Sequence, residues 1–224
     1  MTRSDWRSGT VRAVYHRDEK DCVGVRSRLR CGKCGLEAVF RRVYSGESLC
    51  RGHFLSSVER RVYATMKRYR MLAPTDSVAL AVSGGKDSTS LLHILAKIEK
   101  RFPKARLVAI TVDEGIKGYR DEAVRIAAEN CDKLGVEHRL VSFVDLYGFP
   151  LDSIVEKAEA ASSKLTPCSY CGVLRRKALN RGAVALGATK LATAHNLDDT
   201  VQTVILNLFH GDLWRLSRIE PSTR

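Results

Sequence analysis

The sequence has 224 residues, of which 44% are hydrophobic and 28% are charged. This length suffices for one substantial core with a small appendage, and no apolar stretch reaches the roughly 20 residues that span a bilayer. The formal net charge of +13, from 38 Lys and Arg against 25 Asp and Glu, favours a polyanionic partner, with nucleic acid first. A generally basic surface is the alternative.

The N-terminus lacks the apolar core of a signal peptide, so we expect a cytoplasmic protein without a membrane segment. In that compartment the seven cysteines are better explained as metal ligands or redox-active thiols than as disulfides. The chain is expected to divide into an N-terminal segment with a metal ribbon at 1–53, a linking basic helix at 54–74 and a larger domain at 75–224.

Four candidate metal ligands lie at the end of the first part. Cys31-Gly-Lys-Cys34 and Cys50-Arg-Gly-His53 form two hooks with fifteen residues between them. Three thiolates and one imidazole fill a tetrahedral Zn²⁺ site and leave no position open for water. We therefore predict a structural zinc ribbon, with coincidental cysteines as the alternative.

The rest of the chain is predicted to alternate strands and helices. Apolar residues at three- or four-residue steps indicate a helix at 54–73, which Pro74 ends. Short apolar runs predict strands at 77–83, 105–113, 137–143 and 189–196, and helical patterns fall at 86–102, 119–135, 150–162, 172–187 and 197–211. This alternation predicts an α/β fold with a doubly wound parallel sheet and helices on both faces.

A glycine-rich turn, "SGGKDS" at 83–88, joins the first strand of this sheet to its helix. Gly84 and Gly85 let the backbone approach a ligand closely, and the following helix directs its positive end to the same place. Ser83 and Ser88 add hydroxyls, and Lys86 adds a point charge. We therefore expect a phosphate or pyrophosphate here, and the alternative is an ordinary strand-to-helix turn.

Two later stretches are expected to face the same pocket. Asp113 ends the second strand, and nucleotide sites in such folds lie at the carboxyl ends of strands. His195 and the Asp198–Asp199 pair follow the fourth strand, where carboxylates can hold Mg²⁺ against a pyrophosphate or accept a proton. Helix capping by Asn196 or Asp198 is the alternative for this stretch, and one residue can cap while another faces the ligand.

A second cysteine pair, Cys168-Ser-Tyr-Cys171, precedes the basic helix at 172–187. A helix N-terminus and the nearby Arg175 and Arg176 are expected to lower the thiol pKa values and favour thiolates. Such thiolates can carry sulfur, exchange a disulfide or hold two corners of an iron–sulfur cluster. Cys131 is expected to be a buried core thiol.

"SGGKDS" after an apolar strand resembles the PP-loop of ATP pyrophosphatases, which cleave ATP between the α and β phosphates. Together with the ribbon, "CSYCGVLRR" and "LATAHNLDDTVQT", in this order, it resembles the tRNA 2-thiouridine synthetases over residues 28–215. The resemblance implies a PP-loop, adenine-nucleotide alpha hydrolase-like fold and an ATP-dependent tRNA sulfurtransferase. It would replace the uridine O2 by sulfur and release AMP and pyrophosphate. The implied partners are tRNA, a ubiquitin-like sulfur-carrier protein and a second subunit, as a homodimer or heterodimer.

The resemblance also implies roles for individual residues. Cys168 and Cys171 would be the active-site pair, with Arg175 near the reacting base, Asp199 as an essential acid and Lys86 on the phosphates. The residues implied in ATP binding are Val82, Ser83, Gly84, Gly85, Lys86, Asp87, Ser88, Asp113 and His195. ATP, Mg²⁺ and Zn²⁺ are the implied cofactors, and some members use the cysteine pair with a third cysteine to hold a [4Fe–4S] cluster.

This sequence departs from the family pattern because it has no cysteine after Cys171 and stops where relatives usually continue. We therefore expect a truncated chain or a shortened variant. Two other functions stay open: 2-thiolation of a tRNA cytidine or another PP-loop tRNA modification, and a zinc-ribbon RNA-binding scaffold with an inactive nucleotide site.

Overall fold

A computed structural model describes residues 29–116, 118, 120–160 and 166–219. The chain divides into two compact units, Met1–Val58 and Glu59–Arg224, and the boundary falls within helix α1 (Arg51–Arg68). Cys22 and the rest of the predicted N-terminal segment before residue 29 lie outside the described residues.

The described part of the small unit is built around a two-stranded ribbon. Strands β1 (Phe40–Arg41) and β2 (Ser48–Leu49) pair antiparallel, with Phe40 opposite Leu49. Leu49 is buried together with Cys31 and Cys50, and Phe54 packs against them. A core this small supplies little hydrophobic stabilisation, which is typical of domains that depend on a bound metal.

The large unit is built on a four-stranded parallel sheet. Its spatial order is β5-β4-β3-β6, and each neighbouring pair runs parallel. The strands are β3 (Ser77–Ala81), β4 (Arg106–Asp113), β5 (Glu137–Ser142) and β6 (Lys190–Ala192). Because the chain adds β4 and β5 on one side of β3 and returns to place β6 on the other, the sheet is doubly wound, and the predicted fold class is confirmed.

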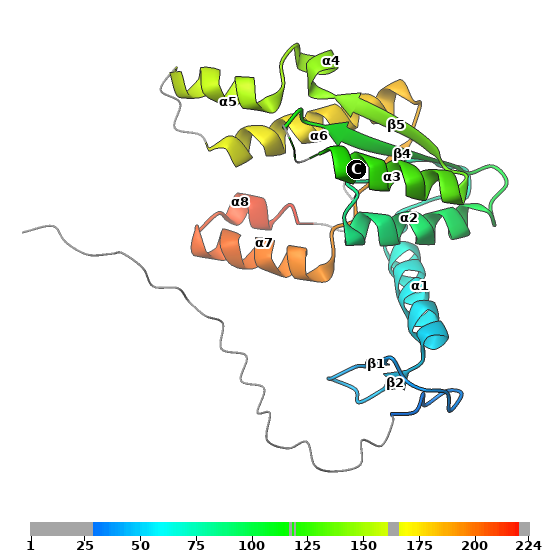
Figure 1. Ribbon diagram of the computed structural model, residues 1–224. Helices are drawn as coiled ribbons and strands as arrows, with labels where there is room; N and C mark the ends of the chain where they lie inside the picture. Colours follow the sequence, from blue (N-terminus) through cyan, green and yellow to red (C-terminus); the bar gives the residue numbers. More distant parts are fainter. Residues whose placement is uncertain (1–28, 117, 119, 161–165, 220–224) are drawn as a thin grey trace, which may run out of the picture. The chain divides into compact units, whose positions relative to one another are not determined.

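Helices cover both faces of this sheet (Figure 1). Helices α2 (Lys86–Glu99) and α3 (Asp121–Leu134) pack on one face, and α6 (Pro167–Ala185) packs on the other, with α5 (Leu151–Ala160) against α6. Since side chains alternate along a strand, Val78, Leu80 and Val82 join the core under α2 and α3, whereas Ala79 joins the core under α6.

Helix α6 approaches the sheet closely at Gly182. A Cβ atom at this position would lie 3.1 Å from Val141 Cγ2 and 3.4 Å from Ile110 Cδ1. Glycine therefore allows the helix to pack against β4 and β5 at this distance. Ala178 and Ala183 on the same helix are also buried, so small side chains set this interface.

Several boundaries differ from the predicted ones. Helix α1 covers Arg51–Arg68 instead of 54–73, and it ends before Pro74 because the chain leaves the helical conformation at Arg70, whose φ is +48°. Helix α6 begins at Pro167 instead of 172, because Thr166 caps it by accepting from the Ser169 N–H and proline suits the first helical position. Strand β6 covers only Lys190–Ala192, and its predicted remainder is the loop leading to α7 (Leu197–Phe209). The short helices α4 (Phe143–Tyr147) and α8 (Leu213–Leu216) were not expected, because single helical turns carry little periodic signal.

Within the described ranges, every helix is too short or too polar to span a lipid bilayer.

Candidate active site

The loop between β3 and α2 is held in shape by its two serines. The Ser83 N–H donates to Ser88 Oγ (3.1 Å), and the two hydroxyl oxygens lie 3.0 Å apart. Ser88 Oγ also donates to the Gly85 carbonyl (3.1 Å), and Ser88 is buried. Both serines therefore fix the backbone of the loop, in addition to any contact they make with a ligand.

Gly84 is required by both the conformation and the surroundings of this loop. Its φ is +78°, and a Cβ atom would lie 2.3 Å from the Ala123 carbonyl oxygen at the start of α3. Gly85 is the N-cap of α2 and offers no side chain to cap it. The first amides of α2 consequently remain available to an anion. Lys86 is the first residue of the same helix; its side chain is 87% exposed, and its ammonium pairs with Asp87 at 3.2 Å.

The loop lies at the topological switch point of the sheet. Strands β4 and β6 flank β3 on opposite sides, so the loops after β3 and β6 face each other across the crevice in which open α/β sheets bind ligands. The β6 loop contains His195, whose Nδ1 lies 2.8 Å from Thr193 Oγ1. The topology therefore brings the predicted nucleotide-binding segments together at one edge of the sheet.

Asn196 and Asp199 form a capping box at the start of α7. Asp199 Oδ2 accepts from the Asn196 N–H (2.9 Å), and Asn196 Oδ1 accepts from the Asp199 N–H (3.0 Å). Capping thus belongs to Asn196 and Asp199, while Asp198 is exposed. A carboxylate has four lone-pair sites, so Asp199 can cap the helix and still accept from a ligand or bind a cation.

Beyond Asp113, the carboxyl end of β4 carries a buried carboxylate that the sequence analysis did not single out. Asp113 Oδ1 accepts from the Gly115 N–H (2.8 Å), and the next residue, Glu114, is fully buried. Arg175 Nε donates to Glu114 Oε1, and Arg120 Nε lies 2.6 Å from Glu114 Oε2 without the alignment of a hydrogen bond. Arg120 also donates to the Val112 carbonyl.

Arg175 connects this carboxylate to the cysteine pair. Its NH2 group donates to Cys171 Sγ at 3.1 Å, while its Nε is held by Glu114. The continuous chain Glu114–Arg175–Cys171 therefore places one sulfur beside the carboxyl end of β4, next in the sheet to the strand that carries the 83–88 loop. No hydrogen bond or ion pair of the described residues joins that loop directly to Cys171.

The expected lowering of the thiol pKa is wrong for Cys171. Its partial burial raises the pKa, and this outweighs the lowering by Arg175, while the charges of Glu114 and Cys168 raise it further. The physical reason is position: Cys171 lies a full turn inside α6 and packs beside the core cluster that includes Phe143. Cys168, one turn earlier, is exposed.

Cys131 is a core thiol, as predicted. It is fully buried between α3 and the sheet, and burial, together with the charge of Asp132, raises its pKa to about 11.

The two hooks of the small unit converge on one point. One ligand atom from each of Cys31, Cys34, Cys50 and His53 lies within 4.8 Å of the others, so the set could hold a metal ion. His53 Nδ1 is 3.4 Å from Cys31 Sγ and 3.3 Å from Cys50 Sγ. Burial raises the pKa of Cys31, but N–H groups of Cys50, Lys33 and Cys34 outweigh it and lower the pKa to about 6, which favours a thiolate.

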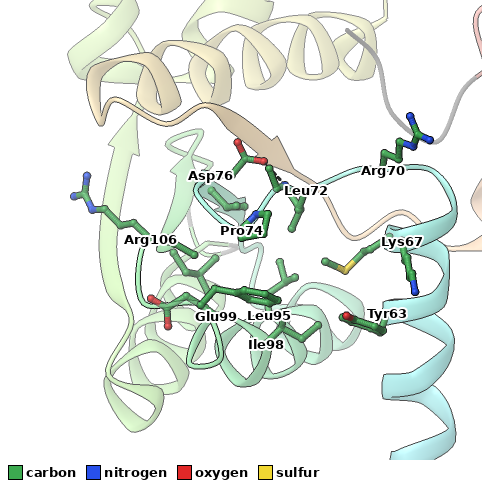
Figure 2. Close-up of a pocket in the computed structure, with 16 residues that line it drawn as sticks. Tyr63, Lys67, Arg70, Leu72, Pro74, Asp76, Leu95, Ile98, Glu99 and Arg106 are labelled. Carbon is green, nitrogen blue, oxygen red and sulfur yellow. Dashed lines mark hydrogen bonds between the residues drawn. The ribbon is translucent and has the colours of Figure 1, made fainter.

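A separate cavity of about 320 Å³ lies at the opposite edge of the sheet (Figure 2). It is lined by side chains from the end of α1, the loop between α1 and β3, and α2, including Tyr63, Leu72, Leu95 and Ile98. Two of its polar lining groups are held by hydrogen bonds: Asp76 accepts from the Ala73 N–H and from Thr189 Oγ1, and Arg106 donates to Glu137 Oε2 and to the Leu186 carbonyl. Because it adjoins the amino ends of β3 and β4, it does not belong to the crevice described above.

Comparison with known proteins identifies the family. The profile of the PP-loop domain matches residues 55–221. The chain is 43% identical over 197 residues to the tRNA 2-thiolation protein NcsA of Haloferax volcanii, covering 85% of this chain and 60% of that protein. It is 40% identical over 190 residues to cytoplasmic tRNA 2-thiolation protein 1 of Anopheles gambiae, covering 84% and 54%.

A solved structure agrees with these matches. It is the U34-tRNA thiolase NcsA from Methanococcus maripaludis with its [4Fe-4S] cluster, at a TM-score of 0.74 and 38% identity. The alignment covers 84% of this chain and 60% of that one, so the chain spans somewhat over half the length of the relatives named here. The predicted resemblance is confirmed, and the chain belongs to the PP-loop family, among relatives named tRNA 2-thiolation proteins.

Proposed function

We propose that this chain carries the catalytic centre of an ATP-dependent tRNA sulfurtransferase that converts a uridine to 2-thiouridine. The observation that supports this most strongly is the Glu114–Arg175–Cys171 chain, which fixes a sulfur at the sheet edge where the 83–88 loop also lies. The named relatives support tRNA as the substrate. Position 34 is the favoured uridine, because the solved relative is a U34-tRNA thiolase.

In the first step, the phosphates of ATP bind at the start of α2. The backbone from Ser83 to Ser88 and the Lys86 ammonium hold the β and γ phosphates, with Val82, Asp113 and His195 around the rest of the nucleotide. The O2 atom of uridine attacks the α-phosphorus, the bond to pyrophosphate breaks, and the N3 proton leaves to solvent. Mg²⁺, when bound by Asp199, would neutralise charge on the departing pyrophosphate.

In the second step, sulfur replaces the adenylated oxygen. Water hydrolyses the thiocarboxylate of a ubiquitin-like carrier to a carboxylate and releases hydrosulfide, which is held beside Cys168 and Cys171 and attacks C2. The C2–O bond then breaks, and AMP leaves with the former O2 atom. Arg175 has N–H groups beyond the one that Glu114 holds, and these stabilise negative charge on the sulfur and on the leaving oxygen.

Cys168 and Cys171 are the described cysteines that could contribute to a [4Fe–4S] cluster. Clusters of this kind are usually held by four thiolates, and Cys168 and Cys171 supply two. Cys131, the remaining cysteine of the large unit, is fully buried in the core.

For the small unit we propose a structural Zn²⁺ held by the three thiolates and His53. The convergence of its four ligand atoms supports this, since such a set closes the tetrahedron and leaves no open position.

Lysines and arginines of α1, among them Arg60, Arg61 and Lys67, are proposed to contact tRNA phosphates with Arg176 of α6. A cytoplasmic location is proposed from the names of relatives.

The test is to incubate the protein with tRNA, ATP and sulfide and to analyse the digested nucleosides by mass spectrometry. We expect 2-thiouridine together with released pyrophosphate. The variants Cys168→Ser and Cys171→Ser should lose the product while still binding ATP, and Cys131→Ser serves as the matched control. Unchanged 2-thiouridine in both active-site variants would contradict the sulfur role, and 2-thiocytidine would identify the alternative substrate.

A further inference from the structure

A cleft borders the start of α6 on the side of Cys168. It has a volume of about 680 Å³ and is lined by Cys168, Gly172, Arg176, Trp214, Arg215 and Arg218, with Ser169 and Val173. Residues 168, 172 and 176 recur every four positions, so they form one face of α6, whereas Cys171 and Arg175 lie on the neighbouring face toward Glu114. The cleft therefore adjoins the proposed reaction centre and shares Cys168 with it.

The chemistry of this cleft combines an exposed aromatic ring with cations. Trp214 is 70% exposed, and the guanidinium carbon of Arg218 lies 4.8 Å from its ring centroid. Arg215 pairs with Asp212 at 3.1 Å, and no Asp or Glu is among the described residues that line the cleft. An indole with most of its surface in water, next to arginines, is the arrangement with which proteins bind single-stranded nucleic acid.

We propose that this cleft binds the unpaired nucleotide next to the target uridine, with its base stacked on Trp214 and its phosphate on Arg176 and Arg218. This inference rests on the proposed function for the identity of the RNA. The positive lining and the net charge of +13 favour a polyanion over an apolar protein segment. The exposed ring of Trp214 favours a nucleic acid among polyanions, because a base can stack on it and an acidic side chain cannot. Cys168 lies in the same cleft, so a nucleotide held there places the next base beside the cysteine pair.

Binding of a base in this cleft should change the fluorescence emission of Trp214. The chain has two tryptophans, so Trp6→Phe leaves Trp214 as the sole emitter. An anticodon stem–loop RNA should quench this emission, and the same sequence closed into a duplex should quench it much less. Trp214→Ala should weaken binding by about 5- to 150-fold, the range that corresponds to stacking of about 1–3 kcal/mol per base.

Matched variants separate stacking from general effects. Trp214→Phe keeps a ring and should restore most of the affinity, and Leu213→Ala, a similarly exposed change in the same short helix, should bind like the parent. Arg176→Ala and Arg218→Ala should each lower the slope of log affinity against log salt by about 0.7 per lost phosphate contact. Circular dichroism checks that each variant is folded.

RNA that binds without altering Trp214 emission, or a Trp214→Ala variant with unchanged affinity, would overturn the cleft proposal and leave the proposed function standing. Quenching by polyglutamate but not by RNA would also overturn it, in favour of a protein partner. Quenching and weakened binding without any thiolation or pyrophosphate release would support the cleft and contradict the proposed function.

Discussion

Replacing Glu114 by glutamine tests the buried charge cluster at the end of β4. The Glu114 side chain is fully buried, and its carboxylate is the anion between Arg120, whose side chain is 10% exposed, and Arg175. Glutamine has nearly the same shape but no charge, so two cations would remain close together with no counter-charge. Arg120 cannot reach water easily, and Arg175 would lose the group that orients it toward Cys171.

The loss of unfolding free energy expected for each variant depends on how deeply its carboxylate is buried. Removing one partner of a buried ion pair costs about 3–5 kcal/mol, because the remaining charge stays desolvated. Glu137 provides a matched comparison, since it also pairs with two arginines, Arg106 and Arg139, but its side chain is 35% exposed. For a pair of this kind the expected loss is about 0–1 kcal/mol.

Urea unfolding of Glu114→Gln and Glu137→Gln measures both losses under one set of conditions. We expect the Glu114 variant to lose several times more unfolding free energy than the Glu137 variant, with a similar dependence on urea concentration. Equal losses in the two variants would refute the reasoning, because they would mean that Glu114 is solvated or that its arginines find other partners. The Glu114 variant should also lose thiolation by more than its unfolded fraction explains, since Arg175 is released.

Four further outcomes are expected. Gly84→Ala should abolish nucleotide binding, measured by calorimetry, because it combines a φ of +78° with a Cβ atom 2.3 Å from a carbonyl oxygen. Iodoacetamide at neutral pH should label Cys168 in the native protein and leave Cys131 unlabelled until urea is added, since Cys131 is buried with a pKa of about 11. Burial lowers the pKa of His138 in the folded protein, so the unfolded chain binds more protons than the folded one. The free energy of unfolding should therefore fall as pH drops below about 6.5, the ordinary pKa of histidine. His138→Gln should remove this part of the pH dependence. Chelators or Cys50→Ser should unfold the small unit, seen as loss of protection in hydrogen exchange at 30–50, while the sheet keeps its protection.

The sheet was predictable because its signals are local. Apolar runs and the glycine turn determine β3, the 83–88 loop and α2 within one short stretch, and both features appear as expected. The four-residue metal site was equally predictable, because two ligand pairs at the spacing of a zinc ribbon indicate one shared site. The structure brings Cys31, Cys34, Cys50 and His53 together as expected.

Features created by distant parts of the chain were not predictable. Glu114 follows a strand and looks like a solvated loop residue, but Leu151 donates to its carbonyl and Arg175 pairs with its carboxylate, so segments 37 and 61 residues away bury it. The pKa of Cys171 was assigned the wrong direction for the same reason. Local sequence shows the arginine that lowers the pKa, but not the packing that raises it. The Trp214 cleft likewise depends on α8 lying beside α6.

The most direct test of the central claim follows the oxygen that leaves the uridine. Transfer RNA carrying heavy oxygen at O2 of the target uridine would be thiolated with ATP and sulfide, and the AMP formed would be analysed by mass spectrometry. If O2 attacks the α-phosphorus of an ATP held at the 83–88 loop and sulfur then displaces AMP, the heavy oxygen appears in the phosphate of AMP. Heavy oxygen released into water, with unlabelled AMP, would contradict the account.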